Sequence, residues 1–330
     1  MSIHVKAIAL LLSTMVATAV PQSATARPAI SVDVDSGTVI SAHEIDRSWH
    51  PASVTKLMTA LIAFEMIKAN KLTMSSPVVF SEHAASTPPS KLGVSAGSTI
   101  PLEQALRIML TRSMNDVAVA IAETVAGNET NFARLMNLKA TSIGMRGTRF
   151  VNASGLHDPR QVSTAADLAI LGRHIVLDFP DHADLFGMPS VSYGKKVLKN
   201  TNGLVGHYAG ARGLKTGYVC AAGFNLVGYA ERDGRRIVTV VLGAPSARQR
   251  ERETTQLLEE AFAAGGGLVA LTSGAPAPSA AIDLRSFGCG KELREKGSAA
   301  SSNVTAMPIP LRRPQRQWAV GGSLEEYGRL

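Results

Sequence analysis

Residues 51–60 place a serine and a lysine three positions apart at the start of an apolar helix. Apolar residues recur at helical spacing over residues 57–67, so a helix that begins near Ala52 or Ser53 puts Ser53 and Lys56 on one face. A serine hydroxyl becomes nucleophilic at neutral pH when a neutral base beside it takes the proton, and a desolvated lysine can be that base. The spacing alone is common, because a lysine near an N-capping serine produces it too. The hypothesis therefore depends on partners further along the chain.

The composition is that of a globular protein. The chain has 330 residues, of which 45% are hydrophobic and 18% are charged, which suits one large domain or two modest ones and argues against wholesale disorder. The net charge of +8 would suit an anionic polymer, a membrane surface or a nucleic acid as a neighbour. Most charge of this kind simply faces solvent, so it receives little weight.

The first 26 residues have the pattern of a secretory signal peptide. Lys6 precedes an apolar run over residues 7–20, and small residues end at Ala26, after which we expect cleavage. An uncleaved anchor is the less favoured alternative, because the run is short for a membrane span. No later segment is apolar enough to span, so membrane anchoring is unsupported. We expect an exported protein of the periplasm or cell wall, which makes a nucleic acid the weakest of the possible partners.

The chain has two cysteines, Cys220 and Cys289. Export would place them in an oxidising compartment, where one disulfide could tie the C-terminal tail to the segment after Gly217. Two free buried thiols remain the alternative.

The periodicity predicts an α/β chain in the broad sense (α+β). We expect an antiparallel sheet with flanking helices and a helical subdomain over residues 71–178. The expected strands cover residues 29–35, 38–42, 206–214, 225–230 and 236–242, and the expected helices beyond the first cover residues 101–110, 117–125, 129–143, 165–177 and 250–264. Residues 27–264 would form the catalytic domain. Residues 265–330, rich in Gly, Ala, Pro and Arg, would form a largely disordered tail with a possible short strand at 281–284.

Residues 93–97, Gly-Val-Ser-Ala-Gly, match the Gly-x-Ser-x-Gly pattern of a nucleophile elbow. That elbow needs a strand running into it and a helix leaving directly from it, and neither is expected here. We therefore predict that Ser95 is a surface turn residue.

Two further groups of polar residues lie in otherwise apolar stretches of the sequence. Ser113 and Asn115 interrupt two apolar helices, where a buried core would prefer no polar group, although a helix cap would explain them as well. Lys215, Thr216 and Gly217 lie in the expected β region.

Together with Ser53 and Lys56, these two groups resemble the three motifs of penicillin-binding proteins and serine β-lactamases, Ser-x-x-Lys, Ser-x-Asn and Lys-Thr-Gly. Residues 51–60, 150–167 and 213–218 look most like the low-molecular-weight D-alanyl-D-alanine carboxypeptidases. The resemblance extends over residues 29–264 and implies a β-lactamase/transpeptidase-like fold.

The resemblance also implies a mechanism. Ser53 would attack the carbonyl of a terminal D-Ala-D-Ala bond in a peptidoglycan stem peptide, with Lys56 as the base. Ser113 would relay the proton to the leaving amine, and Asn115 would hold the substrate amide. The backbone N–H groups of Ser53 and Tyr218 would form the oxyanion hole. β-Lactam antibiotics would acylate Ser53, and neither a metal nor a cofactor is expected.

The departing D-alanine ends in a carboxylate, which calls for cationic recognition. The candidates are Lys215 and Thr216, which directly precede Gly217 in the expected β region, and Arg250. A surface ion pair at a helix start would explain Arg250 equally well.

Three alternatives stay open. A D,D-endopeptidase would use the same residues. A β-lactamase would be weak, because no positioned glutamate follows Ser113. A non-catalytic wall-binding module is disfavoured, since binding alone gives no reason to retain two buried lysines.

Overall fold

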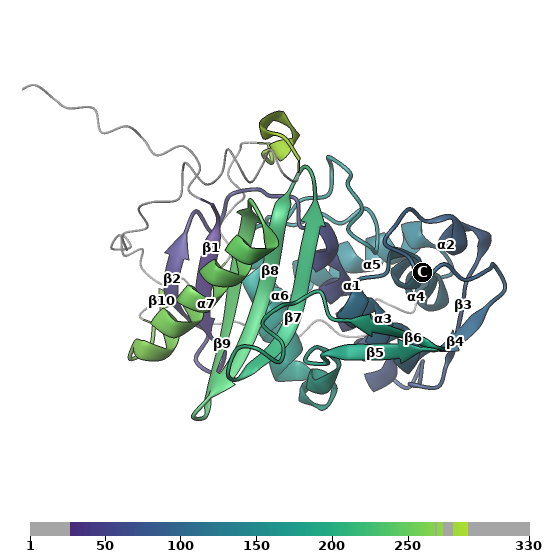
Figure 1. Ribbon diagram of the computed structural model, residues 1–330, viewed down its shortest axis with the longest axis horizontal. Helices are drawn as coiled ribbons and strands as arrows, with labels where there is room; N and C mark the ends of the chain where they lie inside the picture. Colours follow the sequence, from purple (N-terminus) through teal and green to yellow (C-terminus); the bar gives the residue numbers. More distant parts are fainter. Residues whose placement is uncertain (1–26, 268, 273–279, 290–330) are drawn as a thin grey trace, which may run out of the picture.

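A six-stranded antiparallel sheet forms one side of the molecule in the computed structural model, which describes residues 27–267, 269–272 and 280–289 (Figure 1). The strand order is β10-β2-β1-β9-β8-β7, and each neighbouring pair is antiparallel. The strands are β1 (Ala29–Asp33), β2 (Thr38–His43), β7 (Ala211–Val219), β8 (Gly223–Arg232), β9 (Arg235–Ala244) and β10 (Val269–Ala270). The two ends of the chain's folded part thus meet in one sheet.

Both faces of the sheet are covered by helices. Helix α7 (Ala247–Ala263) packs on one face and α6 (Ala165–Asp178) on the other (Figure 1). Successive residues of a strand point to opposite faces. Accordingly, Leu226 of β8 packs in one apolar cluster with Leu258 of α7, while its neighbour Val227 belongs to the main core and faces Gly172 of α6.

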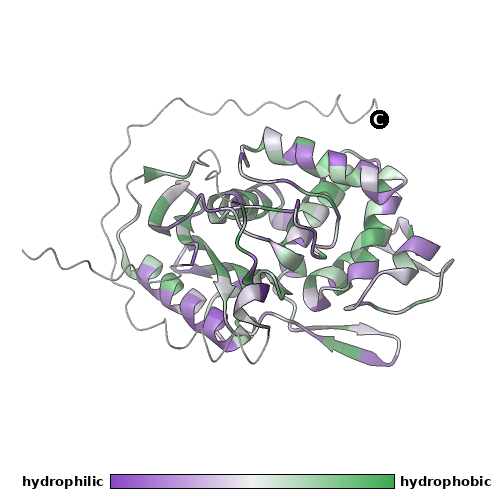
Figure 2. Cartoon of the chain, turned by 90° about the horizontal axis from the view of Figure 1, so that it is seen from above, coloured by the Kyte–Doolittle hydropathy of each residue, from purple (hydrophilic) through white to green (hydrophobic). Residues whose placement is uncertain are grey.

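The rest of the molecule is mainly helical and surrounds α1 (Lys56–Lys68). Ten of the 13 residues of α1 are buried, as expected of a helix that is apolar on all sides. It is preceded by the 3-10 turn η1 (Ala52–Thr55) and contacts α3 (Leu102–Arg112), α4 (Asn115–Ala126), α5 (Glu129–Ser142) and α6. Figure 2 shows that hydrophilic and hydrophobic residues alternate along the helices on the outside of the molecule.

Smaller elements complete the helical side. They are α2 (Glu82–Ser86), the ribbon of β3 (Pro77–Val79) with β4 (Thr99–Pro101), the 3-10 helix η2 (Pro180–Leu185), and the ribbon of β5 (Ser190–Tyr193) with β6 (Lys196–Lys199). Ser95 lies exposed at a turn before β4, which confirms that it is a surface residue.

The predicted antiparallel sheet, its N-terminal hairpin and the long helices are confirmed. Some details of the prediction differ from the structure. The strand expected from residue 206 begins at Ala211, because residues 204–211 form turns, with Tyr208 N–H donating to Leu204 O. Helix α6 packs on the sheet and so does not belong to a separate helical subdomain. The β5–β6 ribbon was not predicted.

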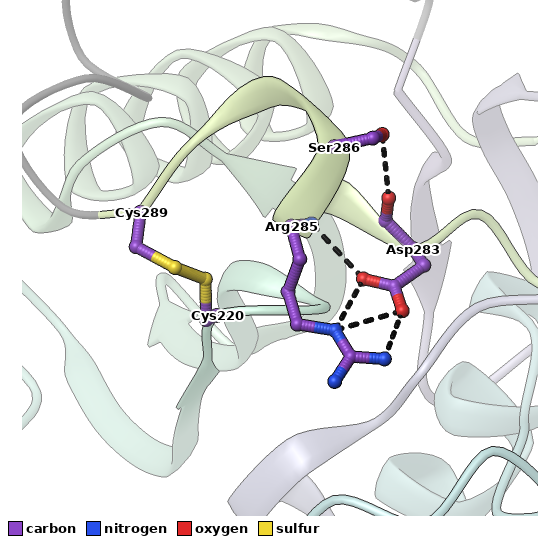
Figure 3. Close-up of a disulfide and its surroundings, with 5 residues drawn as sticks. All are labelled: Cys220, Asp283, Arg285, Ser286 and Cys289. Carbon is purple, nitrogen blue, oxygen red and sulfur yellow. Dashed lines mark hydrogen bonds and ion pairs between the residues drawn. A yellow bond between two sulfur atoms is a disulfide. The ribbon is translucent and has the colours of Figure 1, made fainter.

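The segment 280–289 lies against the end of β7. A disulfide joins Cys220 to Cys289, which confirms one of the two possibilities for the cysteines (Figure 3). Leu284 is buried, and its backbone N–H donates to Ala221 O at 2.9 Å. The strand expected at residues 281–284 was wrong: the segment instead forms the 3-10 helix η3 (Leu284–Phe287), whose Asp283 side chain caps Arg285 N.

The predicted signal peptide (residues 1–26) and most of the predicted tail lie outside the described residues, and the boundary at residue 264 stays a prediction. In the part of the chain that is described, no helix has the length and apolar character needed to cross a bilayer.

Candidate active site

Ser53 and Lys56 lie at the junction of η1 and α1. The chain enters as a 3-10 turn, and the α-helix itself begins at Lys56, four residues later than the earliest predicted start. Ala52 has a φ of 50°, in the left-handed region that few residues with a side chain adopt. Such strain persists only where surrounding contacts hold it, and it is common at functional sites.

The amine of Lys56 is held by three oxygen atoms from three segments. Its Nζ lies 2.9 Å from Ser53 Oγ and 2.8 Å from Asn115 Oδ1, and it also bonds the backbone carbonyl of Ser154. The amide oxygen and the carbonyl can only accept hydrogen bonds. A neutral amine has two N–H donors, which these two acceptors use. In that neutral form the lone pair is left for the Ser53 hydroxyl, as a general base requires.

The surroundings of Lys56 favour this neutral form. Lys56 is completely buried, and burial holds the pKa of its amine well below the usual value. The positive charge of Lys215 lowers this pKa further, against the opposing effects of the Asp116 and Glu129 carboxylates. The charge of Lys215 thus acts in the direction that favours Lys56 as a base.

Ser113 and Asn115 lie in the short connection between α3 and α4. Ser113 ends α3 with a left-handed backbone (φ 68°), which turns the chain so that Asn115 begins α4. The Asn115 side chain accepts from Lys56 and donates to Pro88 O at 3.2 Å. It therefore does not cap a helix, which removes that explanation for Asn115.

Strand β7 runs beside η1. A Cβ on Gly217 would lie 2.9 Å from Pro51 O and 3.1 Å from Ser53 N, so only a glycine lets the strand approach this closely. The next residue, Tyr218, has a side chain that is 41% exposed, with its ring 4.2 Å from that of Phe224. The Lys-Thr-Gly segment therefore lies in the strand itself and borders Ser53.

Lys215 and Arg250 are two buried cations close to this strand. The Lys215 Nζ donates to Thr216 O at 3.0 Å, and burial, with a contribution from the charge of Arg250, lowers the pKa of Lys215 to about 7. Arg250 is only 4% exposed, and burial lowers its pKa although Glu251 opposes this effect. Arg250 does pair with Glu251, at 2.9 Å, but its burial contradicts the alternative of a surface ion pair.

Thr201 links these cations to β7. Its hydroxyl lies 2.7 Å from the Thr216 hydroxyl, and its carbonyl accepts from Arg250 at 3.4 Å. The Arg250 Nε is buried without a hydrogen-bond partner among the described residues. The guanidinium thus keeps one buried donor free, and an unpaired guanidinium donor suits a carboxylate.

Several residues of the site were not singled out from the sequence. Ser154 supplies a carbonyl to Lys56, and a Cβ on Gly155 would lie 1.9 Å from Ala52 O. Buried Asn225 of β8 donates to His50 O at 2.9 Å and to Pro51 O at 3.2 Å, which anchors the entry to η1. The first two lie within residues 150–167, a stretch that carries part of the family resemblance, but nothing in it singled them out.

Within residues 27–267, 269–272 and 280–289, no cluster of three or more His, Cys, Asp or Glu side chains could hold a metal ion.

The family model described as D-alanyl-D-alanine carboxypeptidase matches residues 14–246, more than half of the chain. The chain belongs to this family. Among family members it is 33% identical to the D-alanyl-D-alanine carboxypeptidase DacA of Haemophilus influenzae over 248 residues, which are 74% of this chain and 63% of that protein. It is also 33% identical to DacF of Bacillus subtilis over 242 residues, 72% of this chain and 62% of that protein. The chain therefore spans less than two thirds of the length of these relatives.

Solved structures of family members have the same fold. Penicillin-binding protein 5 from Haemophilus influenzae has a TM-score of 0.69 and 32% identity, over 72% of this chain and 70% of that chain. Penicillin-binding protein D2 from Listeria monocytogenes, in its cefotaxime-bound form, has a TM-score of 0.66 and 31% identity, over 72% of this chain and 96% of that chain. The predicted transpeptidase-like fold is confirmed.

Proposed function

We propose that this protein is a serine D,D-carboxypeptidase that removes the terminal D-alanine from peptidoglycan stem peptides. The observation that carries the proposal is the buried Lys56 amine, whose Nζ lies 2.9 Å from Ser53 Oγ and also bonds two groups that can only accept, Asn115 Oδ1 and Ser154 O. Nucleophile and base within hydrogen-bond reach are what covalent catalysis by serine needs. Family membership points to the same reaction.

Acylation is the first half of the proposed reaction. Lys56 takes the proton of Ser53 Oγ, and Oγ attacks the carbonyl carbon of the penultimate D-alanine. The N–H groups of Ser53 and Tyr218 receive the developing oxyanion. The C–N bond then breaks, and the proton held by Lys56 passes through the Ser113 hydroxyl to the amine of the departing D-alanine.

Deacylation is the second half. A water molecule gives one proton to Lys56, and its oxygen attacks the ester carbonyl. The ester C–O bond breaks, Ser53 Oγ regains its proton, and the shortened stem peptide leaves as an acid. Asn115, which already bonds Lys56, would hold the peptide amide in both halves.

Recognition of the terminal carboxylate is assigned to Lys215, Thr216 and Arg250. The two cations are buried next to each other, so an anion between them relieves their repulsion and gains strength from the low local dielectric. Gly217 lets β7 lie close enough to Ser53 for this group and the scissile bond to be bound at once.

The same proposal places the protein outside the cytoplasm, in the periplasm or cell wall. The pattern of residues 1–26 supports export, and so does the Cys220–Cys289 disulfide, since such bonds persist in oxidising compartments. Acylation by β-lactams follows from the same nucleophile, and the related Listeria protein has been solved in a cefotaxime-bound form.

Release of D-alanine from a soluble peptide ending in D-Ala-D-Ala tests the proposal. In Ser53→Ala we expect the rate to fall by at least about 10³-fold, because the acyl-enzyme cannot form. The control is Ser95→Ala, which changes an exposed serine and should release D-alanine at the wild-type rate. Unchanged release by Ser53→Ala would show that Ser53 is not the nucleophile.

A further inference from the structure

A cavity of about 310 Å³ lies between α5 and the segment of residues 149–160. Three of its lining residues are the arginines Arg134, Arg149 and Arg160. The lining contains no Asp or Glu side chain. Phe150 and Val151 supply an apolar part of the wall. The reaction proposed above uses none of these side chains.

The positive charge of this cavity is only partly compensated. The Arg149 side chain has no hydrogen bond or ion pair with any described residue, and Arg134 donates only to the neutral Asn131 amide, at 3.2 Å. Arg160 pairs with Asp158, at 2.7 Å. The cavity also borders the first two turns of α5, whose N-terminal dipole adds to the positive potential.

The nearest acidic residue at the start of α5 does not neutralise these arginines. Glu129 accepts from the backbone N–H of Ala153 at 2.9 Å, and its other oxygen lies 3.1 Å from His83 Nε2. Two guanidinium groups therefore face the cavity without a carboxylate partner. A guanidinium is the side chain best matched to planar oxyanions, which it binds through two parallel N–H donors.

The cavity is also close to the proposed active site along the chain. The Asn137 side chain accepts from Phe150 N and donates to Phe150 O, both at 2.8 Å, which fixes this wall. Val151 is three residues before Ser154, whose carbonyl binds Lys56, so the chain between them spans at most about 11 Å. A polymer bound at Ser53 could therefore reach the arginines with a neighbouring anionic group.

We propose that this cavity is a second binding site for the polymeric substrate, in which Arg134 and Arg149 hold carboxylate groups of a peptidoglycan stem peptide other than the one being cleaved. The identity of the polymer rests on the function proposed above. The chemistry of the site, recognition of a carboxylate-bearing polyanion by unpaired guanidinium groups, rests on the cavity itself.

Cosedimentation with purified sacculi tests the proposal without turnover when every protein carries Ser53→Ala. The test variant is Arg134→Gln with Arg149→Gln. Its control is Arg146→Gln with Arg248→Gln, which removes the same charge from two exposed arginines outside the cavity. We expect the test variant to bind sacculi about three- to tenfold more weakly than the control in low salt, and the difference to shrink as salt screens the charges. Equal binding by the two variants would overturn the proposal.

Two further arms define the ligand. Sacculi whose carboxyl groups have been converted to amides should bind the protein with both arginines intact about as weakly as they bind the test variant. Competition by inorganic polyphosphate together with full binding to amidated sacculi would overturn the assignment to carboxylates. D-Alanine release from the small soluble peptide, measured with Ser53 intact, reports on the proposed function separately. A test variant that loses D-alanine release by the same factor as it loses sacculus binding would also overturn the proposal. That result would mean that the arginines only support the Phe150 segment.

Discussion

The chemistry of the site depends on where one proton resides between two buried lysines. Lys56 and Lys215 are both buried, and the charge of Lys215 lowers the pKa of Lys56. Repulsion disfavours the state in which both are protonated, and a protonated Lys215 favours the neutral form of Lys56. The proposed mechanism therefore uses a neutral Lys56 as base and a cationic Lys215 as carboxylate ligand.

This arrangement predicts a bell-shaped dependence of kcat/KM on pH for a peptide with a free terminal carboxylate. As pH rises, loss of the Lys56 proton creates the base, so the acid limb rises. Loss of the Lys215 proton, with its pKa of about 7, removes the cation that binds the carboxylate, so the alkaline limb falls. Initial rates at low substrate concentration between about pH 4 and 10 check this. A kcat/KM that rises without a fall up to pH 10 would contradict the role of Lys215.

Thr201 illustrates how a residue outside the three motifs contributes to the site. Its hydroxyl bonds that of Thr216, and its carbonyl accepts from Arg250. In Thr201→Val we expect KM for the carboxylate-ended peptide to rise about three- to tenfold with a smaller change in kcat, because one net hydrogen bond orienting Thr216 is lost. Thr201→Ser keeps the hydroxyl and should retain the wild-type KM. Equal KM values for the Val variant and the wild type would show that Thr201 does not orient Thr216.

At the scale of elements, the site depends on two segments packed closely against η1. Strand β7 approaches it through Gly217, and the segment of residues 150–161 approaches it through Gly155. Gly155 has a φ of 84°, and a Cβ there would overlap Ala52 O. The backbone next to Ser53 is thus held by glycine on two sides.

This packing predicts that Gly155→Ala abolishes acylation. Gly127 is the matched control, because it too has a positive φ (77°) but has nothing within 4 Å of an added Cβ. Both variants should lose about 1 kcal/mol of stability from the left-handed backbone, measured by urea unfolding. Only Gly155→Ala should also lose its reaction with benzylpenicillin, because only there must Ala52 and Ser53 move. Similar reaction rates in both variants would contradict the contact.

The sequence was most informative where a pattern is local. Apolar periodicity located the long helices and the two strands on either side of the β8–β9 turn. The motif spacing also identified Ser53, Lys56 and Asn115, which the structure brings together. The start of β7 was misplaced because apolar residues before Ala211 pack in turns, where periodicity does not distinguish them from a strand.

Other parts of the site depend on contacts between distant segments. The Ser154 carbonyl reaches Lys56 across 98 residues, and Asn225 reaches His50 across 175. A backbone carbonyl has no side-chain signature, and a single asparagine in a strand predicts nothing by itself. Such contacts require the three-dimensional structure.

For the whole molecule, the disulfide connects the C-terminal segment to the strand that borders the active site. Cys220 follows β7 directly, Cys289 lies 69 residues further along, and Leu284 packs into the core between them. Figure 3 shows η3 and the Asp283–Arg285 ion pair beside this bond. The segment is therefore part of the folded structure, at the end of the sheet's edge strand.

Loss of the disulfide should destabilise the protein. Closing a loop of this length lowers the entropy of the unfolded chain, so Cys220→Ser with Cys289→Ser should reduce the free energy of unfolding by between about 2 and 4 kcal/mol. Urea unfolding of the two proteins under non-reducing conditions measures the difference. Reductant should lower the wild-type midpoint and leave that of the double variant unchanged. Equal midpoints without reductant would contradict a stabilising disulfide.

The central claim, that Ser53 is a nucleophile activated by Lys56, is tested most directly by mass spectrometry of the intact protein after incubation with benzylpenicillin. The account predicts a lasting mass increase of one drug molecule, located on Ser53 by peptide mapping and absent from Ser53→Ala. The absence of any adduct on the wild-type protein, or an adduct that persists in Ser53→Ala, would contradict it.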